Sequence, residues 1–184
     1  SFHQNKIIFN NQDMDYYGKV KNSILKNFPG VQVYEREVKG NCKELELYHQ
    51  KAVRFLSNIG FKQAKSDGKE IPFSILQSKK SIIKEFLQSL YEGDGSVKVI
   101  TDKRHGGKSI QILYDSKSKK LISQLKTVLL NFGIITLFPQ KDKRNDCYRL
   151  IISTANNADK FKKEIDFFSA RKKEILGKVK GLNT

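Results

Sequence analysis

Two acidic residues lie two positions apart in a glycine-rich segment, Glu92-Gly93-Asp94-Gly95. Carboxylate oxygens are the ligands that hard divalent cations such as Mg²⁺ take in proteins. Because apolar residues at helical spacing precede the segment, we expect Asp94 to project from the end of a helix. If two such helix ends met, their carboxylates would repel each other unless divalent cations lay between them. Taken alone, the tetrapeptide is also typical of a simple turn that ends a helix.

The helix that must position Asp94 is predicted over residues 79–91 and ends at the glycine-rich segment. Its apolar residues recur at helical spacing: Ile82, Ile83, Phe86, Leu87 and Leu90. The small residue Ser89 would let a second helix pack with its backbone close by. Gly93 and Gly95 would end the helix without the steric cost of a Cβ atom.

Hydrophobic periodicity predicts the remaining elements. A helix capped by Asp13 or Asp15 ends near residue 27, and further helices cover residues 50–58, 117–131, 156–165 and the stretch from 170. Alternating patterns predict strands over residues 6–10, 31–38, 42–48, 96–101, 109–114, 134–138 and 147–153. The order of elements in residues 1–69 repeats in residues 96–172, which indicates two copies of one unit.

The charge of the chain favours a polyanionic partner. Lys and Arg number 35 against 19 Asp and Glu among 184 residues, a formal net charge of +16. Nucleic acid is the first candidate partner. The alternative explanations of the charge are an anionic membrane surface as partner, or a proteome that is rich in lysine throughout. No apolar stretch is long enough for a transmembrane span, and the first residues lack a signal-peptide pattern. Two cysteines exclude a disulfide scaffold and a zinc ribbon.

Residues 87–95 (LQSLYEGDG) resemble the nine-residue LAGLIDADG motif of homing endonucleases. Both Leu positions, the acidic pair and the last Gly match, whereas Ser89 replaces the usual Gly and Glu92 replaces the first Asp. Upstream, residues 69–72 (KEIP) resemble the Lys-x-Ile-Pro element that intein-type members carry before their second motif. Residues 165–173 (IDFFSARKK) resemble the family's "I-G-F-x-S-x-R-K" ending.

The resemblance implies an α+β fold of two pseudo-two-fold-related αββαββα units. Residues 1–78 would form the first, without its leading helix, and residues 79–184 the second with its motif helix. It also implies catalytic roles for Asp94, Lys69 and Lys172, with Lys173 as the alternative to Lys172. Asp94 and Gly93 would hold Mg²⁺ or Mn²⁺. A lysine near the metal could hold the attacking water or stabilise charge on the phosphorane.

In this family, strands of both repeats form a saddle over the major groove of DNA, where a two-stranded ribbon fits. Alternation would put one row of side chains in the core and the other on DNA. We therefore expect DNA contacts from Gln4, Asn10, Gln32, Tyr34, Arg36, Lys39, Lys43, Lys98, Arg104, Lys108, Gln111, Gln140, Lys141, Lys143, Arg144 and Arg149.

The expected function is site-specific cleavage of a long, asymmetric double-stranded DNA target by divalent-metal-assisted phosphodiester hydrolysis. The endonuclease would be encoded within an intein or would belong to a mobile intron. It would be cytoplasmic, with access to DNA. The partners would be double-stranded DNA and an upstream segment or second chain that supplies the missing motif helix; no membrane is expected. The alternative is a non-cleaving DNA- or RNA-binding protein on the same scaffold, such as a maturase-like splicing factor or a degenerate regulator.

Overall fold

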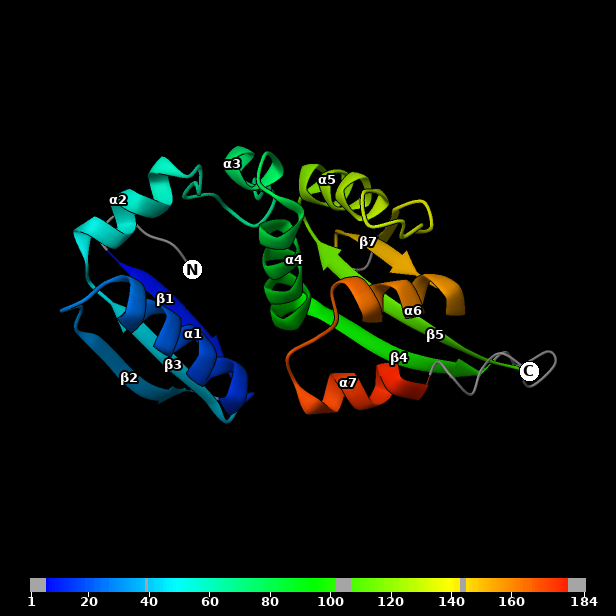
Figure 1. Ribbon diagram of the computed structural model, residues 1–184, viewed down its shortest axis with the longest axis horizontal. Helices are drawn as coiled ribbons and strands as arrows, with labels where there is room; N and C mark the ends of the chain where they lie inside the picture. The colour runs from blue at the N-terminus through cyan, green and yellow to red at the C-terminus, as the bar shows by residue number, and fades with distance from the viewer. Residues whose placement is uncertain (1–5, 39, 102–106, 143–144, 179–184) are drawn as a thin grey trace. The chain divides into compact units, whose positions relative to one another are not determined.

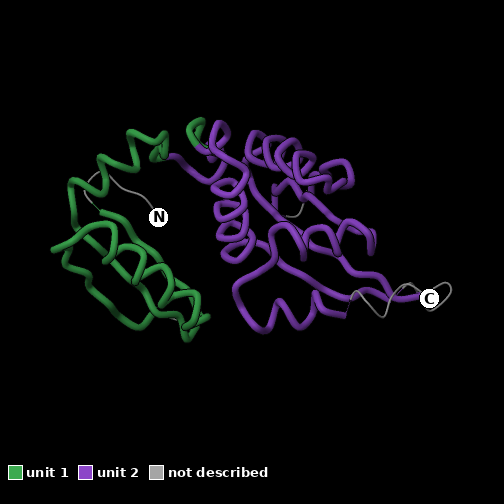
Figure 2. The backbone as a smooth tube through the Cα atoms, viewed as in Figure 1, with its two compact units in different colours: residues 1–63, 72–74 green, residues 64–71, 75–184 purple. Residues whose placement is uncertain are grey.

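The computed structural model describes residues 6–38, 40–101, 107–142 and 145–178 (Figure 1). The chain divides into two compact units, one of Ser1–Gln63 with Pro72–Ser74 and one of Ala64–Ile71 with Ile75–Thr184 (Figure 2). These units are defined by contacts and not by sequence repeats, so the division after residue 78 stays a prediction. Within the described residues, no helix is long and apolar enough to cross a membrane.

Unit 1 contains a three-stranded antiparallel sheet in the order β1-β3-β2. The strands are β1 (Ile7–Asn11), β2 (Val33–Val38) and β3 (Cys42–Leu47), and the helices are α1 (Met14–Asn27) and α2 (Gln50–Asn58). Asp13, one of the two expected caps, starts α1 by accepting a hydrogen bond from the backbone N–H of Tyr16 at 2.9 Å. Tyr17 of α1 packs with Leu45 and Leu47 of β3 in the core of this unit.

Unit 2 contains a four-stranded antiparallel sheet in the order β4-β5-β7-β6. Its strands are β4 (Gly95–Thr101), β5 (Lys108–Ser116), β6 (Gln140–Asp142) and β7 (Cys147–Ile152). Its helices are α4 (Lys80–Asp94), α5 (Lys119–Leu130), α6 (Ala155–Glu164) and α7 (Ala170–Gly177). The short helix α3 (Phe73–Leu76) is shared, since its first two residues belong to unit 1.

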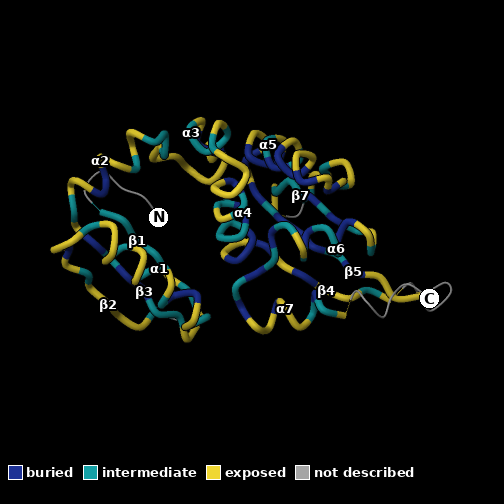
Figure 3. Tube along the Cα trace, viewed as in Figure 1, coloured by how far each residue is buried: buried dark blue, intermediate teal, exposed yellow. Residues whose placement is uncertain are grey.

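One hydrophobic core holds unit 2 together. Leu87 of α4, Leu125 of α5, Phe161 of α6 and Leu176 of α7 are buried in the same cluster as the β5 residues Ile110 and Ile112 (Figure 3). Because alternate residues of a strand point to opposite faces, the four helices cover the sheet face that carries Ile110, Ile112 and Tyr114. The other residues of β5, which include Gln111 and Asp115, lie on the opposite face.

The predicted repeat is visible in the topology. The series β1, α1, β2, β3, α2 has the same order as β5, α5, β6, β7, α6. The strand orders β1-β3-β2 and β5-β7-β6 also correspond. Unit 2 has α4 and β4 in addition, and no counterpart of them is present among the described residues of unit 1. The expected mixed α+β fold with a repeated unit is therefore present.

Two predicted element boundaries are wrong. Residues 134–138 do not form a strand, and β6 begins only at Gln140. Pro139 lacks the N–H that a ladder needs, and Leu137 makes a single bond to the Ile151 carbonyl at 2.8 Å. The motif helix continues to Asp94, beyond the expected end at residue 91, because Gly95 is its C-cap and donates its N–H to the Tyr91 carbonyl.

Candidate active site and nucleic-acid interface

Asp94 is the last residue of α4, and its side chain is exposed. The Tyr114 hydroxyl donates a long hydrogen bond of 3.5 Å to Asp94 Oδ2. Tyr114 lies directly opposite Gly95 in the β4–β5 ladder, so the strand pairing places this hydroxyl beside the helix end. Burial of the Tyr114 ring raises the pKa of its hydroxyl, and the nearby Asp94 carboxylate raises it further. Tyr114 thus remains a neutral donor that orients Asp94.

The turn from α4 into β4 requires glycine at position 95. A Cβ atom there would lie 2.5 Å from the Tyr91 carbonyl oxygen and 2.8 Å from Tyr91 Cδ1. Gly93 is different, because a Cβ atom there would meet nothing within 4 Å. The close approach at Gly95 sets the direction in which Asp94 leaves the helix.

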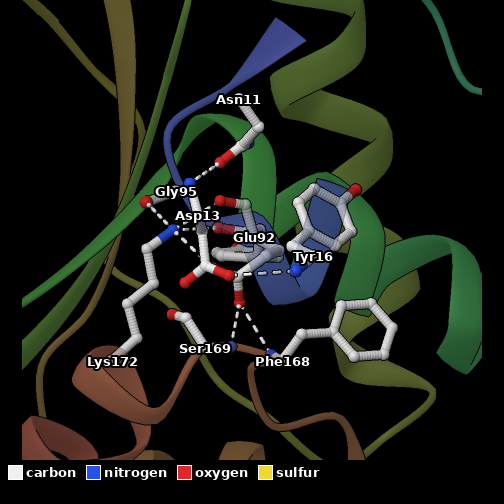
Figure 4. Close-up of polar contacts among 9 residues, drawn as sticks. Asn11, Asp13, Tyr16, Glu92, Gly95, Phe168, Ser169 and Lys172 are labelled. Carbon is white, nitrogen blue, oxygen red and sulfur yellow. Dashed lines mark hydrogen bonds and ion pairs between the residues drawn. The ribbon is translucent and has the colours of Figure 1, made fainter. Parts of the chain in front are cut away.

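Glu92 points inward, away from the environment of Asp94. Its side chain is 3% exposed. Its Oε2 atom accepts hydrogen bonds from the backbone N–H groups of Phe168 at 2.7 Å and Ser169 at 3.1 Å (Figure 4). Ser169 is the N-cap residue of α7. The carboxylate therefore satisfies N–H groups at the start of α7, where negative charge is favourable.

Lys172 of α7 makes the reciprocal contact with the end of α4. Its Nζ donates to the carbonyls of Tyr91 at 3.2 Å, Glu92 at 2.5 Å and Gly95 at 2.9 Å (Figure 4). It also lies 3.6 Å from Glu92 Oε1, with 8% of its side chain exposed. The cation lies at the C-terminal end of α4, where the helix dipole favours positive charge. The structure thus brings Lys172 to the residues that flank Asp94, and its catalytic role stays a prediction. Lys173, the alternative, is exposed.

Lys69 has a firmly held backbone and an exposed side chain. The Ser118 hydroxyl, which also caps α5, donates to the Lys69 carbonyl at 2.5 Å. The N–H of Ile71 donates to Gln124 Oε1 at 2.8 Å, so both ends of the predicted Lys-x-Ile element are tied to α5. Ser118 is four residues beyond Tyr114, a separation of at most about 14 Å of chain.

The donor set at the end of α4 fits a hydrated Mg²⁺ or Mn²⁺ ion. Asp94 offers an exposed carboxylate, and the exposed Gly93, also expected to bind metal, precedes it. Across the described parts of the chain, no three His, Cys, Asp or Glu side chains gather to hold a metal. One carboxylate suits Mg²⁺, which keeps several waters and takes substrate phosphate oxygens as ligands.

The polar face of the β4-β5-β7-β6 sheet carries four of the expected DNA-contacting residues. Lys98 pairs with Gln111, and Arg149 pairs with Gln140, all on the face opposite to the helices. Two others follow the opposite alternation: Lys108 pairs with Thr101 on the Ile110 face, and Lys141 pairs with Tyr148.

The polar face of the β1-β3-β2 sheet carries Asn10, Tyr34 and Arg36. It also carries Glu44 and Glu46, which form ion pairs with Arg36 and Lys6. The alternation places Lys43 on the other face, where its Nζ lies 3.4 Å from Glu35. Gln32 is exposed and precedes β2. Five expected residues lie outside the described residues: Gln4, Lys39, Arg104, Lys143 and Arg144.

Sequence reasoning missed Tyr114 and Asp115 as site residues. Asp115 accepts two hydrogen bonds from Arg149, from Nε at 2.8 Å and from Nη2 at 2.9 Å. Tyr114 ends the buried run of β5 and Asp115 follows it, so both side chains resemble the end of a core strand. Only the strand register, which sets Tyr114 beside Gly95 and Asp115 beside Arg149, identifies them.

Comparison with known proteins confirms the resemblance. Residues 81–166, from α4 through α6, match the model of the LAGLIDADG-like domain. The replication factor C small subunit of Methanocaldococcus jannaschii is 28% identical over 183 residues, 97% of this chain and 9% of that protein. A DNA gyrase subunit of Mycobacterium kansasii is 28% identical over 91% of this chain and 30% of its own length. The M. jannaschii glutamine–fructose-6-phosphate aminotransferase is 24% identical over 88% of this chain and 15% of its own length. The chain spans under a third of each of these relatives.

Solved structures share the fold. The homing endonuclease I-DmoI, in complex with DNA and Mn, matches with a TM-score of 0.61 at 17% identity, over 88% of this chain and 80% of that chain. Full-length DUF199/WhiA from Thermatoga maritima matches with a TM-score of 0.57 at 12% identity, over 98% of this chain and 54% of that chain. At these identities the likeness shows the fold alone.

Proposed function

Because residues 81–166 form a LAGLIDADG-like domain, we propose that this chain is part of a site-specific endonuclease that cuts both strands of a long, asymmetric DNA target. The observation that carries the proposal is the exposed Asp94 carboxylate at the end of α4. Its acidic neighbour Glu92 is buried and engaged with α7. The exposed Asp94 carboxylate, which accepts a hydrogen bond from the buried Tyr114, is available to bind a ligand from solvent.

The residues at the end of α4 divide the work of phosphodiester hydrolysis. Asp94 would hold a Mg²⁺ or Mn²⁺ ion with its carboxylate, and that ion would supply Lewis-acid activation of water and of the leaving oxygen. Tyr114 donates its hydroxyl to the same carboxylate. Lys69 extends its ammonium into solvent from a pinned backbone and stabilises charge on the phosphorane. Lys172 acts at the same helix end, where it holds the carbonyls that flank Asp94.

Cutting two strands requires a second carboxylate, which a second copy of the motif helix would supply. The described part of unit 1 has counterparts of β5, β6, β7, α5 and α6. An upstream segment of the same protein or a second chain would bring the counterpart of α4. Since the two units differ in sequence, each would read a different half of the target, which makes the target asymmetric.

The identities of the relatives favour an intein-type or intron-mobile origin. Replication factor C, a DNA gyrase and an aminotransferase are unrelated proteins, yet each matches almost this whole chain over a small part of its own length. A segment shared by unrelated hosts is what a mobile inserted element would leave. Such an element would act inside the cell, in the cytoplasm, where its DNA target is accessible.

A second candidate is a protein that binds DNA without cutting it. The formal net charge of +16 favours DNA binding without deciding cleavage, and this chain shares its fold with DUF199/WhiA as well as with I-DmoI. The exposed Asp94 carboxylate beside Tyr114 favours the endonuclease, since a protein that only binds the phosphate backbone gains nothing from an acidic group at its binding surface.

The test compares Asp94→Asn with the full-length protein on duplex DNA selected for tight binding from a random library. We expect the wild type to cut this duplex when Mg²⁺ is added and to stop when EDTA removes the metal. Asp94→Asn should bind with similar affinity but cut at least about a hundredfold more slowly. Asp15→Asn, an equal change of charge on α1, should cut normally. Tight binding without cutting by the wild type would favour the second candidate and refute nuclease activity.

A further inference from the structure

Three side chains form one row across the polar face of the β4-β5-β7-β6 sheet. Asp115 of β5 lies opposite Arg149 of β7, and Arg149 lies opposite Gln140 of the edge strand β6. Directly opposite residues in an antiparallel sheet have Cβ atoms about 4.5–5.5 Å apart and point to the same face. Arg149 and Asp115 keep 30% and 36% of their side chains exposed, so the row is open to a ligand.

The ion pair holds the Arg149 guanidinium by only one of its edges. Nε donates to Asp115 Oδ1 at 2.8 Å and Nη2 donates to Oδ2 at 2.9 Å. A guanidinium has five N–H donors in a planar fork. The pair uses Nε–H and one Nη2–H, which leaves the second Nη2–H and both Nη1–H groups as donors, two of them parallel on the other edge. The hydrogen bonds to Asp115 raise the pKa of Arg149, so the fork stays cationic.

We propose that Arg149 reads a guanine in the major groove and that Asp115 is the positioning residue that holds it for this contact. The free edge of the fork matches guanine O6 and N7, which accept two parallel hydrogen bonds. Asp115 fixes the side chain before DNA arrives, so less conformational entropy is lost on binding. Gln140, beside Arg149, presents the amide that pairs with an adjacent base. This inference rests on the proposed function, since it names the base that the same DNA-binding surface recognises.

Unit 1 has an arginine–carboxylate pair of a different construction, between β2 and β3. Arg36 of the edge strand β2 contacts a single oxygen of Glu44, with Nε at 2.7 Å and Nη2 at 2.6 Å from Oε1. The Arg36 side chain is 66% exposed, against 30% for Arg149. A guanidinium held by one oxygen can pivot, whereas two parallel bonds fix its plane. Of these two arginines, Arg149 is therefore the one held in a fixed plane for recognition of one base.

The experiment selects binding sites from randomised duplex DNA in EDTA, which prevents cutting, with the full-length protein and four variants. The variants are Arg149→Lys, Asp115→Asn, Gln140→Ala and the control Arg54→Lys, which alters an exposed arginine of α2. We expect the wild-type site to contain one guanine that Arg149→Lys no longer selects, with about a tenfold loss of preference at that position only. Asp115→Asn should weaken the same preference, and Gln140→Ala should alter an adjacent position. Arg54→Lys should leave the selected sequence unchanged. Thermal unfolding of each variant checks that it is folded.

Two results would overturn the inference in distinguishable ways. If the wild type binds a defined sequence and the folded Arg149→Lys variant selects the same bases, Arg149 and Asp115 form only a structural ion pair, and the endonuclease proposal stands. If the wild type binds no duplex DNA, the proposed function and the inference both fail.

Discussion

Two acidic residues two positions apart in α4 lie in opposite environments. Glu92 is buried against α7, while Asp94 is exposed beside Tyr114. A helix turns by about 100° per residue, so positions two apart point in nearly opposite directions. Only the outer carboxylate is therefore available to a metal, and the inner one serves to fix the helix that carries it.

The two glycines beside Asp94 should respond oppositely to alanine. Gly93→Ala should stabilise the fold by about 0.5–1 kcal/mol, because the added methyl meets open space within a helix. Gly95→Ala should destabilise it by about 1–3 kcal/mol, because the methyl meets Tyr91 at 2.5 Å. Urea unfolding measures both changes, and equal effects of the two substitutions would contradict the structure.

Lys172 should matter for stability far more than Lys173. Lys172→Met should cost about 3–5 kcal/mol, because it leaves the Glu92 carboxylate buried without its cation and removes the donor to three carbonyls. The double variant Glu92→Gln/Lys172→Met should cost less than the two single changes added together. The exposed neighbour supplies the control, and Lys173→Met should change stability by under about 0.5 kcal/mol. A stable Lys172→Met variant that has lost cleavage would instead point to a direct catalytic role.

Capping decides where the elements of unit 2 begin and which loops they hold. The completely buried Ser118 hydroxyl accepts from the Leu121 N–H and donates to the Lys69 carbonyl, so one side chain starts α5 and anchors the loop that carries Lys69. Glu92 and Lys172 similarly join the end of α4 to the start of α7. Each expected catalytic residue is thus placed by the end of a helix rather than by its middle.

Removal of the Ser118 hydroxyl should affect both stability and cleavage. Ser118→Ala should destabilise unit 2 by about 1–2 kcal/mol and slow cutting, since the Lys69 loop loses an anchor. Thr154→Ala removes the equivalent cap of α6, where the hydroxyl accepts from the Asn157 N–H at 3.3 Å. It should lower stability without a specific loss of cleavage. Equal cleavage by the two variants at matched stability would show that Lys69 needs no such anchor.

For the whole molecule, the formal net charge of +16 does not make the two polar sheet faces uniformly basic, because acidic side chains lie on them as well. Glu44 and Glu46 on unit 1 and Asp115 on unit 2 pair with Arg36, Lys6 and Arg149. If the chain binds DNA as proposed, paired arginines would be suited to base recognition, whereas exposed lysines would supply contacts to phosphate. Affinity and sequence preference should therefore depend on different residues.

Binding to duplex DNA should weaken steeply with salt. If the protein neutralises about 6–10 phosphates, its binding constant should fall about 10³–10⁵-fold between 50 and 200 mM salt. Fluorescence anisotropy with a labelled duplex measures the slope of log K against log salt. Arg149→Lys should leave this slope unchanged, because it keeps the charge. A flat salt dependence would rule out a phosphate-dominated interface.

Local patterns in the sequence determined the helices except the short α3, most strands, the repeat, the motif helix and the exposed carboxylate at its end, because periodicity and glycine positions act over a few residues. The prediction failed at residues 134–138, where an apolar run that resembles a strand ends at Pro139. Tertiary structure alone decided that Glu92 and Lys172 face each other, that Tyr114 reaches Asp94 and that Asp115 holds Arg149. Those contacts join residues 20 to 80 positions apart, and their partners follow from strand register and helix packing rather than from any local signal.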